Sequence, residues 1–389
     1  MINDSKLYNQ SLSSGQSFIY FILIGFCTLY LDAMPIVDKL FSLLRLGVSA
    51  LVFAQFFAHR TKLGWFVLLM ACYWAFVLYT TRLHHGHIVG VISYGITILA
   101  LFISMQKDLE INPVGTMKTL CNIFSFFIYA NFITLLLFPN GIWMTEDGNA
   151  RFLIGGNYNQ MGGFIIVGLT TNLAYYHMNP YAKRSSLFLL FSIALLTVTL
   201  VGSQTSTVGV AALLLFVLAP TEKIRKLGFV AMIVLYFIFQ HLTVFSLTEY
   251  SENSYFGKFI TQGLKKDLTF TERTTIWRST QLMIIKSPVI GYGRQDEEWH
   301  YANIDGMMPH NWVLTLLLKG GVVLLGIFVI IMIYCMRCSI HNHSPANFYI
   351  MCGAWVLASM MIMEVYNIGL ICYLLCLMAN ADKLKLETT

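Results

Sequence analysis

Four arginines in the polar parts of the chain have the side chain best suited to binding a phosphate. They are Arg151, Arg273, Arg278 and Arg294. A guanidinium keeps its charge and can donate two parallel hydrogen bonds to one phosphate group. Near a membrane surface, such side chains fit the diphosphate head group of a lipid. Arginines that are simply solvated, or that attract anionic lipid heads, are the alternative.

His310 and Asn311 stand where a polar stretch returns to an apolar one, within Pro309-His310-Asn311-Trp312. A histidine can donate or accept a proton near neutral pH. Asn311 could cap a helix or orient a substrate hydroxyl. A helix cap followed by a tryptophan at the membrane interface is the purely structural alternative.

Two polar turns have the composition of sugar-binding loops. In the first, Arg151 is followed by two glycines and then by Asn157, Asn159 and Gln160. Glycines let the backbone approach a ligand, and amides hydrogen-bond to hydroxyl groups, although Asn157 or Asn159 could simply cap a helix. The second turn, 202–207, contains Gln204 and is either a broken helix lining a cavity or a polar hairpin.

Two ionisable residues lie inside or between apolar stretches. Glu364 falls in a short turn between the last two of them and could face the same cavity as His310. Lys319 lies within an apolar stretch, where an ionisable residue is a functional candidate. An acidic group could bind a metal or supply a base; its members are Asp296, Glu297, Glu298, His300 and Asp305. Its spacing fits no metal-site pattern and a solvated loop is the alternative, so no metal is assigned. The Gly-Tyr-Gly of 291–293 lies in a charged loop, which argues against a potassium filter.

Composition identifies the setting of these residues. The chain has 389 residues, of which 57% are hydrophobic and 11% charged, and its mean hydropathy is +0.67. So few charges cannot cover a soluble domain, and the apolar runs reach the roughly 20 residues that cross a bilayer. We expect an all-α polytopic membrane protein, with 1–389 as a single transmembrane domain and no nucleic-acid partner.

About twelve membrane-spanning helices are predicted from the apolar runs. Their approximate limits are 18–35, 40–58, 64–80, 88–105, 119–138, 160–178, 186–202, 205–220, 227–247, 311–336, 347–363 and 367–380.

Lysine and arginine concentrate in alternate connections between these helices. By the positive-inside rule, both termini are cytoplasmic, and the large loop 248–310 lies on the outer face. Within that loop we expect a short amphipathic helix at 274–286, beginning near Thr271 and ended by Pro288. Its predicted apolar face consists of Ile276, Trp277, Leu282, Ile284 and Ile285.

Three patches, in this order, resemble the O-antigen polymerase/O-antigen ligase family, which includes Wzy-like capsular and exopolysaccharide polymerases. They are Arg151 with GGNYNQ, then RTTIWRSTQLMIIKSPVIGYG, and then HNWVLTLLLKGGVVLLG. Each patch is loose by itself, but the ordered set is fairly specific. The resemblance covers roughly residues 140 to 340.

The resemblance implies a metal-independent, GT-C-like glycosyltransferase without a cofactor. Such enzymes join lipid-diphosphate-linked oligosaccharides on the outer face of the cytoplasmic (inner) membrane. By similarity, Arg273 and Arg151 would hold the diphosphate, and His310 would assist the acceptor hydroxyl or the leaving group. Family members often carry Ser-Arg after the seventh span, whereas here Ser203 precedes Gln204. One cationic contact is therefore missing, or is replaced by Arg45 or Arg278.

The predicted function is a polysaccharide polymerase that transfers a growing glycan from polyprenyl diphosphate to a lipid-linked repeat unit. Catalysis is assigned to Arg273, His310 and Arg151. The predicted substrate-binding residues are Arg278, Arg294, Asn157, Asn159, Gln160, Gln204, Asn311, Arg45 and Glu364. A flippase and a chain-length regulator would be its protein partners.

Two alternatives stay open. One is a ligase that passes glycan to lipid A-core or protein. The other is a transporter or flippase of lipid-linked sugars, which would be expected to have related halves and polar residues at mid-membrane.

Overall fold

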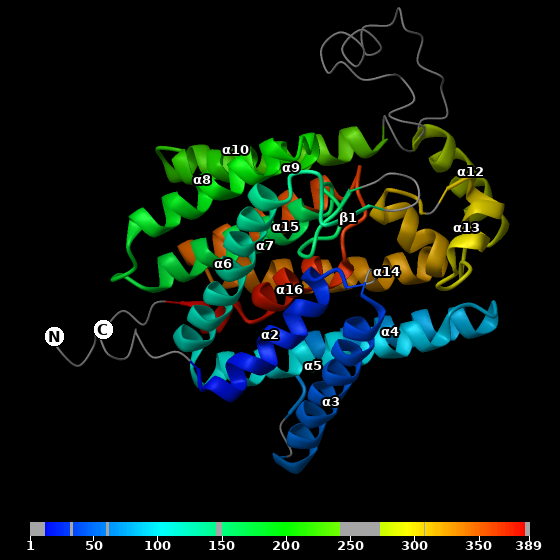
Figure 1. Ribbon diagram of the computed structural model, residues 1–389, viewed down its shortest axis with the longest axis horizontal. Coiled ribbons are helices and arrows are strands. Elements are labelled where there is room, and N and C mark those ends of the chain that lie inside the picture. The colour runs from blue at the N-terminus through cyan, green and yellow to red at the C-terminus, as the bar shows by residue number, and fades with distance from the viewer. Residues whose placement is uncertain are drawn as a thin grey trace, which may run out of the picture.

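The computed structural model describes residues 12–31, 34–59, 62–144, 150–241, 273–306 and 308–385. Thr271 and the loop residues 248–272 lie outside this part of the chain. The described residues form an elongated bundle of helices (Figure 1). The described ranges also contain one short two-stranded ladder, β1 (Trp143–Met144) with β2 (Ala150–Arg151), and two isolated β-bridges, Leu29 with Ile154 and Phe152 with Gly156.

A long helix occupies the position of every predicted span. In chain order these helices are α2 (Ser14–Thr28), α3 (Pro35–His59), α4 (Trp65–Leu83), α5 (Ile88–Ile111), α6 (Pro113–Leu137), α7 (Met161–Met178), α8 (Arg184–Leu200), α9 (Gln204–Leu218), α10 (Glu222–Phe239), α14 (Trp312–His341), α15 (Pro345–Met360) and α16 (Ile368–Ala379). A short 3-10 helix, η3 (Ala381–Leu384), follows.

Five of these helices, α3, α4, α5, α6 and α14, are long and apolar enough to cross a membrane, judged by length and composition. Others, such as α2, α9 and α16, are equally apolar but shorter. The apolar helices indicate an integral membrane protein. That all twelve helices cross the bilayer stays a prediction.

Several predicted helix limits were wrong by more than a turn. The first helix ends at Thr28 rather than at 35, and the fifth begins at Pro113 rather than at 119. The reason is local: the side chain of Asn112 accepts a hydrogen bond from the backbone of Gly115 and starts α6 early, with Pro113 in its first turn. Polar residues in the first turn had hidden this start from a hydropathy reading.

The core of the bundle is built from helices that are apolar on all sides. Nearly every residue of α7 and α16 is buried, as expected for helices surrounded by other helices. Helices α8 and α10, at the top of Figure 1, instead expose large apolar side chains, including Leu189, Leu196, Leu227 and Leu235. Such a surface suits contact with lipid.

Helix α14 is interrupted by two glycines, which the sequence analysis had treated as part of one span. Gly320 and Gly321 have non-helical backbone angles, and φ of Gly321 is +59°. The freed carbonyls of Leu318 and Lys319 accept hydrogen bonds from the backbone of Tyr292 (2.7 Å) and Gly293 (2.8 Å). In return, the backbone N–H of Val322 donates to the carbonyl of Pro288 (2.8 Å). A polar break in a membrane helix is thus satisfied by the loop that follows α12.

This junction explains the Gly-Tyr-Gly sequence. Gly291 and Gly293 both have positive φ, and a Cβ on Gly293 would lie 2.3 Å from Cα of Thr81 in α4. A Cβ on Gly321 would lie 2.2 Å from the carbonyl carbon of Val289. The glycines therefore let segment 288–293 fit between α14 and the end of α4.

Two short helices, α12 (Arg273–Lys286) and α13 (Glu297–Ile304), lie together at one end of the bundle (Figure 1). The predicted helix at 274–286 is therefore confirmed. Its predicted apolar face was partly wrong. Trp277 is buried and Ile276 and Ile284 pack against buried residues, but Leu282 and Ile285 are 57% and 71% exposed.

Candidate functional site

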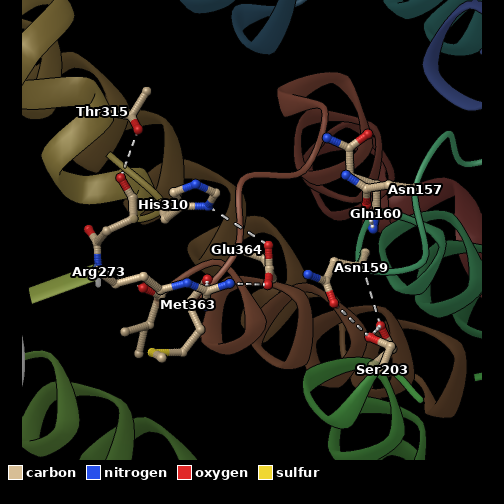
Figure 2. A network of polar contacts seen from close by, with 12 residues as sticks. Asn157, Asn159, Gln160, Ser203, Arg273, His310, Thr315, Met363 and Glu364 are labelled. Atoms are coloured by element: carbon tan, nitrogen blue, oxygen red, sulfur yellow. Dashed lines mark hydrogen bonds and ion pairs between the residues drawn. The ribbon is translucent and has the colours of Figure 1, made fainter. Parts of the chain in front are cut away.

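A buried ion pair joins α12 to the turn between α15 and α16. Nη2 of Arg273 lies 2.5 Å from Oε1 of Glu364, and the side chains are 16% and 7% exposed. Nη1 of Arg273 also donates to the backbone carbonyl of Met363. Figure 2 shows the guanidinium facing this turn. Arg273 is the first residue of its helix, so its long side chain can reach from the end of α12 into the bundle.

His310 lies against the same carboxylate. Its Nδ1 is 4.0 Å from Oε2 of Glu364 (Figure 2), and its side chain is 31% exposed. Burial, and secondly the positive charge of Arg273, lower the pKa of His310 from 6.5 to about 4. The imidazole is therefore neutral at pH 7. Nδ1 is buried with no hydrogen-bond partner, and the residue has φ of +48°, a conformation that costs a non-glycine residue free energy.

Asn311 holds the start of α14 in place. Its Oδ1 accepts from the backbone N–H of Leu314 (3.0 Å), and its Nδ2 donates to the carbonyl of Ile362 and to Oε1 of Gln240, both at 3.1 Å. It is fully buried. Asn311 thus joins α14, the end of α10 and the Glu364 turn, which matches the helix-cap alternative. A direct role in substrate binding stays a prediction.

A cavity of about 540 Å³ adjoins this centre. Pro309, which precedes His310, and Val365, which follows Glu364, line this cavity together with Tyr366. Aromatic and aliphatic side chains form much of its wall, and its charged lining side chains are two cations, Lys319 and Arg294, and two carboxylates, Asp296 and Glu297. An apolar pocket with a few polar groups is the usual form of a ligand site.

The amide turn before α7 packs near the same region. Asn157 accepts from the backbone of Gln160 (2.8 Å) and so stabilises the turn before α7. The N-cap residue of α7 is Gln160, and it makes no side-chain cap hydrogen bond. Asn159 accepts a long hydrogen bond from Ser203 (3.5 Å). Figure 2 draws Asn159 and Ser203 in the same polar group as Glu364. A Cβ on Gly163, in the first turn of α7, would lie 2.6 Å from the ring of Tyr366, so the start of α7 and the Glu364 turn are in close contact.

Three predicted residues lie elsewhere. Arg151 is in β2, half-buried, with its guanidinium 5.7 Å from the ring centre of Tyr30. Arg278 is exposed on α12, and Gln204 is exposed at the start of α9. Their proposed contacts with substrate stay predictions.

Arg45 and Arg294 come together at a second cavity, of about 520 Å³. Both arginines were predicted as separate phosphate contacts, and nothing in the sequence indicated that they would meet.

Residues that the sequence analysis missed include Tyr94 and Asn367. The hydroxyl of Tyr94 hydrogen-bonds to Oδ1 of Asn367, and that oxygen also accepts from the backbone of Gly369 (2.9 Å). Both line the 540 Å³ cavity. An asparagine after the Glu364 turn was a readable signal, since it caps α16, but a tyrosine within an apolar helix gave none.

Two of the acidic residues of 296–305, Asp296 and Asp305, make hydrogen bonds that support local structure. Asp296 caps α13 by accepting from the backbone of Trp299 (2.8 Å), and Asp305 accepts from Ser279 (2.6 Å). In the described ranges, His, Cys, Asp and Glu form no group of three or more that could hold a metal ion.

Comparison with known proteins gives one match. Residues 189–329 match a family model described as O-antigen ligase. The matched region includes Arg273 and His310, and it supports the O-antigen polymerase/ligase family for the chain. No curated protein and no solved structure matches the chain.

Proposed function

We propose that this chain, which matches the O-antigen ligase family model over residues 189–329, is a polysaccharide polymerase. It would transfer a growing glycan from polyprenyl diphosphate to a sugar hydroxyl of a lipid-linked repeat unit. The reaction would take place on the outer face of the cytoplasmic membrane, with both termini cytoplasmic, and a flippase would supply the repeat units.

The observation that carries this proposal is the meeting of Arg273, Glu364 and His310 beside the 540 Å³ cavity. A transferase of this kind needs positive charge for the departing diphosphate and a neutral base for the acceptor hydroxyl. Arg273 offers the first and His310, with a pKa of about 4, the second.

The proposed step is a single displacement. The acceptor oxygen bonds to the anomeric carbon of the donor glycan, and the bond from that carbon to the diphosphate oxygen breaks. The diphosphate leaves with the bonding electrons, held by the guanidinium of Arg273, and Arg151 is proposed as a further contact. The hydroxyl proton passes to His310, and Glu364, 4.0 Å away, stabilises the imidazolium that forms.

The low pKa makes His310 a weak base in the free protein. A bound diphosphate would offset the charge of Arg273, which is one cause of the depression. The pKa of His310 would then rise towards its ordinary value when the donor is bound, so basicity would increase when it is needed.

A ligase is the second candidate, because the matching family model carries that description. The two activities share a donor and differ in acceptor. The geometry around Arg273 suits both, so the acceptor supplied in an assay separates them.

The test is reconstitution of purified protein with polyprenyl-diphosphate-linked repeat units, followed by sizing of the lipid-linked glycan. The wild type is expected to form a ladder. Arg273→Lys keeps the charge next to Glu364 but loses the planar guanidinium with its paired donors. His310→Ala removes the base. Each variant should slow elongation by about 100-fold or more. Lys286→Ala, an exposed change on the same helix α12, is the matched control and should elongate normally.

Normal ladders from a stable His310→Ala protein would remove His310 from the mechanism. Glycan formed only when lipid A-core or protein is supplied would favour the ligase. Movement of lipid-linked sugar across vesicles without any elongation would replace the enzyme with a transporter.

A further inference from the structure

A second positively charged cavity lies away from Arg273. Its volume is about 520 Å³. Its walls come from α3, α5, the end of α2 with the residues after it, and Arg294 beyond the α14 junction. It contains two arginines, Arg45 and Arg294, and one carboxylate, Asp38. Its charged side chains therefore sum to a net positive charge, which favours an anionic ligand.

Arg45 is a buried cation with unused hydrogen-bonding capacity. It is only 9% exposed, and its guanidinium carbon lies 4.0 Å from the ring centre of Phe26. One nitrogen, Nη2, donates to Oγ of Ser93 (2.7 Å), while Nε is buried with no partner. A buried donor without a partner is costly, and an anion in the cavity would supply the missing acceptor.

Arg294 is fixed by its backbone rather than by an ion pair. Its N–H donates to Oγ1 of Thr81 (2.8 Å), and its carbonyl accepts from the backbone of His87 (2.9 Å). A Cβ on Gly90 would lie 3.2 Å from Nη1 of Arg294, so the guanidinium rests against α5, on the wall of the cavity. The α14 junction therefore delivers this arginine to the same space as Arg45.

The surroundings of the cavity favour a lipid-borne anion over a soluble one. On α3, residues between and beside Asp38 and Arg45 expose large apolar side chains, and α5 does the same next to Gly90. These residues are Ile36, Leu40, Leu43, Val89 and Ile92. A ligand with an anionic head in the cavity and a hydrocarbon chain along α3 and α5 satisfies both surfaces.

The two cavities share three lining residues. His87, Tyr94 and Arg294 belong to both. A head group held between Arg45 and Arg294 therefore lies next to the cavity that Pro309 also lines.

We propose that the Arg45–Arg294 cavity binds the diphosphate of the acceptor lipid, separately from a donor diphosphate at Arg273. This inference rests on the proposed glycan transfer. It assigns the two lipid substrates to two different arginine sites, joined by the 540 Å³ cavity in which the sugars meet.

The first experiment measures binding alone, so that it does not depend on catalysis. Native mass spectrometry of the purified full chain with polyprenyl diphosphate should show two lipids on the wild type and one on Arg45→Gln/Arg294→Gln. Arg82→Gln is the matched control, because Arg82 carries the same charge at the end of α4 next to Thr81 but is exposed; it should keep two. Inorganic pyrophosphate, tested in parallel, should bind much more weakly than the lipid.

The second experiment uses donor and acceptor with differently labelled glycans. Arg45→Gln should raise the KM for the acceptor by about 10- to 100-fold, as expected for loss of a charge-assisted hydrogen bond, and leave the KM for the donor within about twofold. Arg45→Lys, which keeps the charge and is the safeguard against a folding defect, should give a smaller rise.

The outcomes separate the two proposals. If the wild type binds a single lipid and Arg45→Gln/Arg294→Gln still binds it, this inference is overturned, whereas the proposed polymerase activity is unaffected. Two sites with the expected variant effects but no glycan transfer would keep the site and reject the polymerase. Pyrophosphate binding as tightly as the lipid would overturn the lipid assignment.

Discussion

The pair Arg273–Glu364 should be strongly coupled in stability, and a double-mutant cycle measures this directly. At an effective dielectric constant of 20, two charges about 4 Å apart interact by about 4 kcal/mol. Both side chains are largely buried, so removing either one would leave the other charge buried without its ion-pair partner. Arg273→Gln and Glu364→Gln should each lower the free energy of unfolding by about 3 kcal/mol.

The double variant should lose far less than the sum of the two, because it leaves neither charge unpaired. The expected coupling is about 2 to 4 kcal/mol. Unfolding in mixed micelles with increasing SDS, followed by tryptophan fluorescence, gives the four free energies. The measurement needs no substrate, so it tests the structure and not the proposed function.

An internal control is the surface pair of Lys226 and Glu222. Its nitrogen–oxygen distance is 2.6 Å, close to the 2.5 Å of the Arg273–Glu364 pair, but its side chains are 62% and 72% exposed. Solvent screens such a pair, so its cycle should show much weaker coupling. Additive losses at Arg273 and Glu364, within about 0.5 kcal/mol, would refute the buried pair.

Three further predictions follow from the same geometry. Gly321→Ala should prevent normal folding, because φ is +59° and the new Cβ would lie 2.2 Å from the backbone of Val289. Gly326→Ala is the control: a Cβ there meets nothing within 4 Å, so this variant should fold. The yield and monodispersity of each variant in detergent check both expectations. Asn311→Ala should cost about 2 to 4 kcal/mol in unfolding, since it leaves buried groups such as Gln240 without a partner. With His310 as the base, kcat/KM should fall only as the pH drops through about 4, where His310 of the free protein takes up a proton. The acid limb of kcat should lie at higher pH, because the bound donor raises the pKa of His310. An acid limb of kcat/KM near pH 6.5 would contradict the structure.

Much of the fold followed from apolar periodicity, while the junction in α14 did not. Every predicted apolar segment contains a helix, because length and hydropathy are local properties. The break at Gly320 and Gly321 occurs inside an apolar run, and its hydrogen bonds go to Tyr292 and Gly293. Only the pairing of segment 288–293 with the break in α14 explains why both segments contain glycines.

The candidate site shows the same division. Arg273, His310 and Glu364 were each named from residue type and position, but Arg273 and Glu364 are 91 residues apart, and nothing in the sequence predicted their contact. The error at Leu282 and Ile285 has a related cause. Periodicity identifies an apolar residue, but it does not show whether another helix or a lipid surface covers it.

The two arginine sites differ in how their charge is balanced, and the difference fits the proposed roles of their ligands. Glu364 lies 2.5 Å from Arg273 and would repel an anion bound there, so a diphosphate at that site would be held less tightly than by a free guanidinium. Arg45 has an unpartnered Nε in a cavity that also contains Arg294. In the proposed reaction the donor diphosphate must leave after each transfer, whereas the acceptor lipid must stay bound until its glycan has been extended. A compensated arginine for the leaving group and a pair of arginines for the acceptor meet these opposite requirements.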